Sequence, residues 1–115
     1  MQDDSNNRWV ELVSKLIALT QDGVLKWNKT DYQGGSGFFQ FKFEKYIVPY
    51  KKKKIILSVF PLSVPGKQYK LEIASDDEVP LFEIPITSGI KDLHDAVKYS
   101  ASGVKQFIDD LLAED

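Results

Sequence analysis

The sequence has 115 residues, which is enough for one domain and too few for two. It lacks cysteine, which excludes disulfides, thiolate zinc sites and a cysteine nucleophile, and its net charge of −2 removes the simplest argument for nucleic-acid binding. Its composition, 43% hydrophobic and 28% charged, is that of a globular chain. Without a basic start or a long apolar run, it predicts a cytoplasmic protein with no membrane contact.

The first predicted element is a helix over Arg8 to Thr20, because apolar residues recur there at three- and four-residue spacing. Gly23 is expected to end this helix. Residues 1–7 are expected to fray, and three of them are candidate N-caps: Ser5, Asn6 and Asn7.

Strands are predicted next along the chain. A short strand covers Val24 to Asn28, and a polar, glycine-rich loop follows over residues 29–37. Apolar and polar residues then alternate in a strand over residues 39–48, which should stop by Pro49. One face of that strand carries Phe39, Phe41 and Phe43.

Three further strands complete a predicted sheet. Residues 55–60 are apolar on both faces, which is typical of a central strand. Residues 67–74 alternate, and residues 81–86 form the last strand, with Phe82, Ile84 and Ile86 expected to point inward. Pro80 and Pro85 cannot donate to a ladder, so this last strand is placed at an edge.

The chain from Ile90 onward is predicted to be helical, with Ser88 as N-cap. Gly103 inside this region predicts a kink or break near Ser100 to Gly103, with one long helix as the alternative. A narrow apolar stripe follows one side: Ile90, His94, Val97, Ala101, Val104, Ile108 and Leu111.

This order of elements predicts an α+β fold. We expect an antiparallel sheet of four to five strands, an N-terminal helix and a C-terminal helical segment, because runs of strands with helices at the ends are typical of that class. Residues 1–115 are expected to form a single domain, since no internal repeat or linker interrupts them.

Two groups of residues form recognisable motifs. One is the pattern L-T-x-x-G-x-L-x-W over residues 19–27, and the other is a late apolar set, Leu93, Val97, Val104 and Phe107. Together they resemble small uncharacterised bacterial α+β proteins of similar length, which share a first helix, this turn, a meander and a C-terminal helix. The resemblance implies the same fold for most of this chain and assigns no activity, cofactor or site residue.

Few residues suggest catalysis or metal binding. His94 is the single histidine, so a histidine zinc site cannot form, and we expect His94 to be structural. The glycine loop at residues 34–37 lacks the ending of a P-loop, and the acids at residues 76–78 lack the ligand pattern of a calcium loop. The sequence therefore predicts no enzyme activity, with no catalytic, cofactor or metal site.

Lysines concentrate in residues 42–54, where six lysines accompany one acid, Glu44. Lysines beside aromatic rings bind single-stranded nucleic acid, but lysines also keep an apolar strand from pairing with another chain. Both interpretations stay open here, whereas residues 92–115 are acidic. The candidate contacts to a partner or to phosphate are Tyr46, Tyr50, Lys51, Lys52, Lys53, Lys54, Ile56 and Phe60.

Ile56 and Phe60 are expected to lie on the sheet face opposite the phenylalanines at positions 39, 41 and 43. Tyr46 and Val48 are expected to join Ile56 and Phe60, giving an apolar patch that stays exposed if both helices cover the other face.

The function that the sequence favours is a non-catalytic protein–protein interaction module, of the kind that acts as an immunity, anti-defence or regulatory protein in bacteria or phage. Its partner is another protein or a second copy of the chain. The alternative is a nucleic-acid-binding module that uses residues 42–54, and an enzyme comes third.

Overall fold

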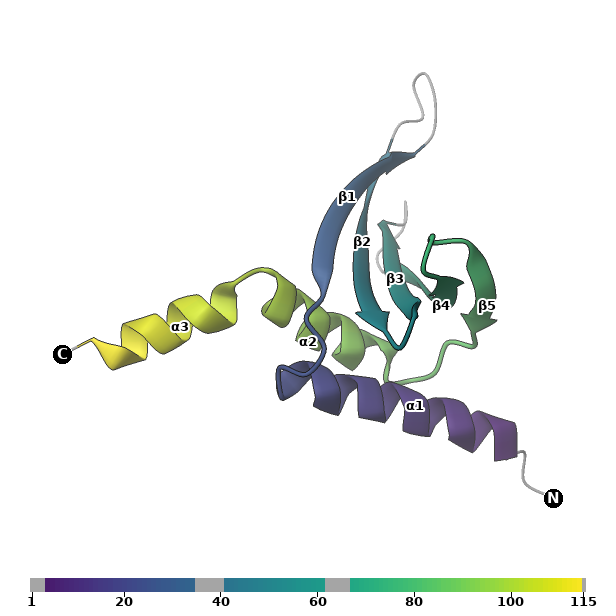
Figure 1. Ribbon diagram of the computed structural model, residues 1–115, viewed down its shortest axis with the longest axis horizontal. Helices are drawn as coiled ribbons and strands as arrows, with labels where there is room; N and C mark the ends of the chain where they lie inside the picture. The colour runs from purple at the N-terminus through teal and green to yellow at the C-terminus, as the bar shows by residue number, and fades with distance from the viewer. Residues whose placement is uncertain (1–3, 35–40, 62–66, 115) are drawn as a thin grey trace. The chain divides into compact units, whose positions relative to one another are not determined.

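A computed structural model describes residues 4–34, 41–61 and 67–114 (Figure 1). It confirms the predicted α+β class, with an N-terminal helix, a five-stranded antiparallel sheet and two C-terminal helices. In chain order the elements are α1 (Asp4–Gln21), β1 (Asn28–Gly34), β2 (Phe41–Tyr50), β3 (Lys53–Pro61), β4 (Lys67–Ser75), β5 (Pro80–Ile84), α2 (Ile90–Ala101) and α3 (Val104–Ala113).

The described chain divides into two compact units. The described residues between 28 and 86 form the sheet unit, and those of 4–27 together with 87–114 form the helical unit. The sheet is a meander in the order β1-β2-β3-β4-β5, so β3 is central and β5 lies at an edge, as predicted. The strands bend strongly along their length (Figure 1).

The first strand differs from the prediction. Residues 24–27 form no strand, and β1 instead occupies residues that were expected to be a polar loop. Its sequence lacks the apolar alternation of a half-buried strand, but pairing with residues 41–47 of β2 satisfies those of its backbone groups that face β2. Tertiary pairing therefore overrides the local pattern at this edge. Residues 35–40, which include Phe39, lie outside the described chain.

The second strand also runs further than predicted. β2 passes through Pro49 and ends at Tyr50. Its pairing with β1 stops at Ile47, so Pro49 lies where β2 has only one neighbouring strand. A proline is tolerated there because one side of the backbone needs no donor.

The register decides which side chains share a face, because residues directly opposite each other point the same way. Tyr46 pairs with Leu57, Leu57 with Leu71, and Leu71 with Ile84, and all four side chains are buried. Tyr46 and Val48 therefore share the face of Leu57, and the expectation that they join Ile56 and Phe60 is wrong.

The opposite face carries Ile56 and Phe60 together, as predicted, and also Phe43, which was expected on the other face. Ile47 pairs with Ile56, and the ring centroids of Phe43 and Phe60 are 4.8 Å apart. The prediction that Phe43 and Phe60 lie on different faces is thus wrong, because the two-residue turn after Tyr50 shifts the register by one residue. At the edge, Ile84 is buried as predicted, while Phe82 and Ile86 are exposed.

In the helical unit, α1 and α2 pack against each other. α1 begins at Asp4, so the candidate caps Ser5, Asn6 and Asn7 lie inside the helix, and residues 4–7 are helical. Ser88 is not the N-cap of α2, because Gly89 occupies that position without a side-chain hydrogen bond. The buried residues of the two helices include Val13, Leu16, Ile90, Leu93, His94 and Val97.

The end of α1 follows the prediction closely. Gly23 adopts a left-handed φ of 79°, its N–H donates to the Thr20 carbonyl, and the Val24 N–H donates to the Leu19 carbonyl. These two bonds define a Schellman motif, which satisfies the carbonyls at the end of the helix.

Candidate functional site

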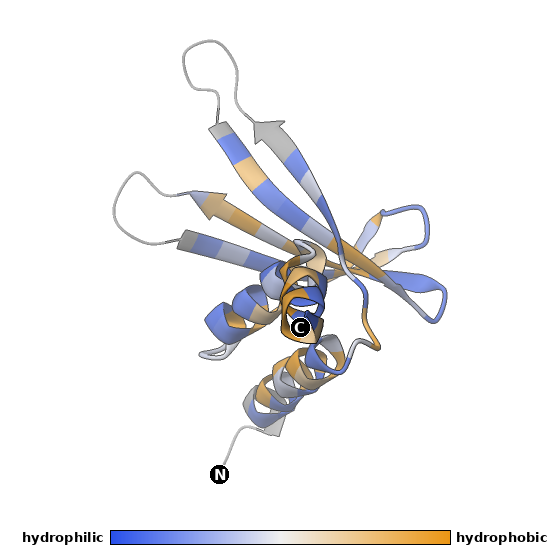
Figure 2. Ribbon diagram, turned by 90° about the vertical axis from the view of Figure 1, so that its left-hand side faces the viewer, coloured by the Kyte–Doolittle hydropathy of each residue, from blue (hydrophilic) through white to orange (hydrophobic). Residues whose placement is uncertain are grey.

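The most unusual surface of the described chain is the apolar side of α3. Five apolar residues recur at three- and four-residue spacing, and none of them is buried. The ribbon of the C-terminal helix carries both hydrophobic and hydrophilic positions (Figure 2). We call this set the α3 stripe: Val104, Phe107, Ile108, Leu111 and Leu112. The exposed fractions are 64% for Phe107, 56% for Leu111 and 80% for Leu112. Contiguous apolar patches of this kind mark interaction sites on protein surfaces.

A break before α3 separates it from α2. Gly103 has a left-handed φ of 78°, and the predicted break between Ser100 and Gly103 is confirmed. Ser102 holds the junction, since its N–H donates to the Lys98 carbonyl and its hydroxyl accepts the Val104 N–H at 3.3 Å. α3 therefore starts as a new helix that leads away from α2 (Figure 1).

The other side of α3 is polar and is stabilised within the helix. Lys105 Nζ lies 3.2 Å from Asp109 Oδ2, and Gln106 Nε2 donates to Asp110 Oδ1 at 2.8 Å. These pairs, four residues apart, support the helix from its solvent face. The two sides of α3 thus differ sharply in polarity.

A groove of about 640 Å³ lies beside α3 in the helical unit. Its apolar lining comes from Ile17 and Ala96, together with Tyr99, whose side chain is 43% exposed. Asp92 and Asp95 also line it, and both are exposed to solvent, where carboxylates lack the secluded setting that acid–base catalysis uses. Lys105 is the one residue of α3 among those that line the groove, so the groove lies toward the polar side of α3 and is separate from the α3 stripe.

The predicted lysine segment divides between a turn and a strand. Lys51 and Lys52 form the two-residue turn between β2 and β3, and both have positive φ, 48° and 66°. Lys53 and Lys54 lie outside this turn and begin β3. Tyr50 is exposed, with Lys51 Nζ 5.4 Å from its ring centroid.

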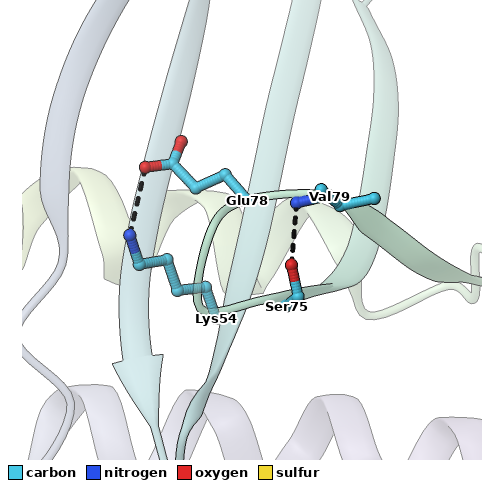
Figure 3. Close-up of polar contacts among 4 residues, drawn as sticks. All are labelled: Lys54, Ser75, Glu78 and Val79. Atoms are coloured by element: carbon cyan, nitrogen blue, oxygen red, sulfur yellow. Dashed lines mark hydrogen bonds and ion pairs between the residues drawn. The ribbon is translucent and has the colours of Figure 1, made fainter.

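The sheet places acids beside these lysines. Lys53 pairs with Ser75, so the turn that follows Ser75 lies at the same end of the sheet as the lysine turn. Lys54 Nζ contacts Glu78 Oε2 at 3.1 Å, and the Ser75 hydroxyl accepts the Val79 N–H at 3.1 Å (Figure 3). The acids of residues 76–78 therefore offset the positive charge that the sequence pattern emphasised.

The remaining predicted contacts are not exposed. Ile56 is only 1% exposed, Tyr46 is fully buried, and Phe60 is half-buried against Phe43. The Tyr46 hydroxyl donates a hydrogen bond to Glu44. Burial, followed by this bond, raises the pKa of Tyr46 above its ordinary value. The expected exposed patch around Ile56 is therefore absent from the described sheet.

Sequence reasoning found part of the α3 stripe and misjudged its surroundings. Val104, Ile108 and Leu111 were expected on one apolar stripe with residues of the preceding helix, whereas Phe107 and Leu112 were assigned no place on that stripe. The signal that could have revealed the surface was the combination of a glycine break and a run of apolar residues after it. A break removes the geometric need for both halves to share one packing surface.

Comparison with known proteins gives no assignment, because no family model, no curated protein and no solved structure matches this chain. Among the described residues, no three side chains of histidine, aspartate or glutamate gather as metal ligands do. The described helices include none with the length and apolar character needed to span a bilayer.

Proposed function

We propose that this protein is a non-catalytic interaction module that binds another protein chain through the α3 stripe. The observation that carries the proposal is that α3 has ten residues, five of them large and apolar, and buries none. Single exposed apolar residues are ordinary on protein surfaces, but five on one side of one helix form a contiguous patch.

The length of α3 supports this proposal. Isolated helices shorter than about 12–15 residues are marginal in water, and most helical stability in proteins comes from packing an apolar face. α3 has such a face and no buried residue to anchor it. A protein partner that covers the stripe supplies the missing packing, in the manner of an amphipathic helix that enters an apolar groove.

The biological role that we propose is that of a small immunity, anti-defence or regulatory partner in the cytoplasm. This role rests on analogy with small non-catalytic proteins.

Site-specific photo-crosslinking in the native cell tests the binding surface. A photoreactive phenylalanine analogue at position 107 should give a discrete crosslinked product, identified by mass spectrometry, because Phe107 lies within the stripe. The matched control carries the same analogue at position 106, on the polar side, and should give none. No product from position 107, or equal products from both positions, would contradict the proposal.

A further inference from the structure

The charges of α3 run against its own dipole. Helices favour acids in the first turn and bases in the last turn. α3 has neither: Lys105 lies in the first turn, Asp110 in the last turn, and Glu114 caps the C-terminal end. Each end of this helix therefore carries side-chain charge of the sign that its backbone dipole disfavours.

A second α3 in antiparallel orientation corrects this arrangement. It brings the acidic end of each helix beside the end of the other that carries Lys105 and the positive backbone dipole. A parallel copy would instead place Asp110 and Glu114 of both chains together, where like charges repel. The charge pattern thus selects one orientation for a second copy.

We propose that α3 pairs antiparallel with α3 of a second copy of this chain, so that the two α3 stripes face each other. This inference rests on the proposed function, because it assigns a partner to the same surface. The pairing is a two-fold contact in which each copy offers the same residues. Its axis lies near Ile108, the position midway between Val104 and Leu112.

The small apolar area of the α3 stripe limits the strength of the pairing. Side chains of this size bury roughly 100 Å² each, so the four most exposed members of the stripe with Tyr99 supply about 500 Å² per copy. Stable interfaces bury about 800 Å² per partner. We therefore expect a weak dimer that dissociates at low concentration.

Sedimentation equilibrium over a wide concentration range measures this pairing. The wild-type chain should pass from monomer to dimer as its concentration rises. Phe107→Glu should weaken the dimer by roughly 30-fold or more, as removal of a central apolar contact does. Ala113→Glu adds the same charge at an exposed position on the side of α3 opposite the stripe and should leave the dimer intact. A wild-type chain that stays monomeric throughout would overturn the pairing.

The absence of cysteine makes the orientation measurable, because each introduced thiol is unique. Ile108→Cys should form a disulfide with its own copy, and a mixture of Val104→Cys and Leu112→Cys chains should crosslink to each other, since a disulfide needs close Cβ atoms. Leu112→Cys alone should not crosslink efficiently. Efficient crosslinking of Leu112→Cys chains with each other would indicate a parallel pair and overturn the antiparallel proposal.

The two proposals fail separately in these experiments. A monomeric chain whose position 107 crosslinks to a different protein would overturn the self-pairing and support the proposed interaction module. A monomeric chain that crosslinks to nothing would overturn both.

Discussion

Thr20 shows how a short motif can be entirely structural. Its hydroxyl donates to the Leu16 carbonyl at 2.7 Å and accepts the Trp27 indole N–H at 2.9 Å, and both Thr20 and Trp27 are buried. With the left-handed Gly23 and the buried Leu25, these contacts account for every specified position after the first leucine of L-T-x-x-G-x-L-x-W. That leucine supplies the carbonyl of the Schellman motif. The motif therefore describes a helix end and carries no chemistry.

Thr20→Val should lower the free energy of unfolding by roughly 1–3 kcal/mol, because the indole N–H of Trp27 would be buried without its acceptor. Urea denaturation followed by tryptophan fluorescence measures the change. Thr30→Val, at an exposed position of β1, is the matched control and should have little effect. Equal effects of the two substitutions would contradict the structural role of the motif.

The raised pKa of Tyr46 predicts how the free energy of unfolding depends on pH in the alkaline range. A raised pKa means that the folded chain keeps the phenol proton at a pH where the unfolded chain releases it. The contribution of Tyr46 is therefore complete below its ordinary pKa of 10.0 and is lost as the pH rises above that value.

The free energy of unfolding should accordingly fall more steeply above pH 10.0 for the wild type than for Tyr46→Phe, by up to about 1.4 kcal/mol per pH unit. Denaturation series at several alkaline pH values measure both slopes, and the comparison removes the contributions of the other titrating groups. Parallel slopes would show that Tyr46 titrates normally in the folded chain.

The turn between β2 and β3 is the element that fits its sequence least well. Two-residue hairpin turns with positive φ at both positions favour Asn-Gly, yet Lys51 and Lys52 occupy them. A left-handed conformation costs an ordinary residue roughly 1–2 kcal/mol. Stability alone therefore does not explain why lysines occupy these two positions. A physical reason to retain them is that their charge keeps this end of the hairpin from pairing with another chain.

The double substitution Lys51→Asn and Lys52→Gly should raise the free energy of unfolding by about 1–2 kcal/mol, because both new residues adopt positive φ readily. Lys53→Asn is the control, since it changes an exposed strand residue without positive φ and should not stabilise the protein. Chemical denaturation measures all three chains. A loss of stability in the double variant would mean that the turn differs from the one described.

Prediction from sequence succeeded for elements whose pattern is local. The alternation in β3 and β4, the helix pattern of α1 and the Gly103 break all follow from the residues themselves. β1 could not be predicted from its sequence, because a polar edge strand is stabilised by pairing with the neighbouring strand, here β2. The sheet face to which the Tyr46 side chain points could not be predicted either, because the register depends on the turn that joins β2 and β3.

At the scale of the whole molecule, substitutions of two leucines distinguish the core from the proposed interaction surface. Leu57 is fully buried in the central strand β3, whereas Leu112 is largely exposed on α3. Leu57→Ala should cost roughly 2–5 kcal/mol of unfolding free energy, and Leu112→Ala less than about 0.5 kcal/mol in dilute solution. Denaturation curves at a concentration that favours the monomer compare the two, and a large loss from Leu112→Ala there would place that side chain in the monomer core.

The distribution of charge predicts weak interaction with nucleic acid. Acids 76–78 lie at the same end of the sheet as the lysine turn, and Glu78 pairs with Lys54. We expect no measurable binding of a single-stranded oligonucleotide at about 50 mM salt, where phosphate contacts are strong. Fluorescence anisotropy tests this, and wild-type binding that disappears in Lys51→Glu/Lys52→Glu chains would restore the nucleic-acid alternative.

The sequence by itself determined the fold class, the central position of β3 and the break before α3, because periodicity, proline and glycine act through local geometry. Only the tertiary structure decided that the acidic turn lies beside the lysines, that Ile56 is buried and that the α3 stripe is exposed. These properties depend on strand register and on the direction a helix takes after a break. The register depends on the turn that joins two strands, and the exposure of α3 depends on whether other segments reach it, so neither can be read from the residues of one segment alone.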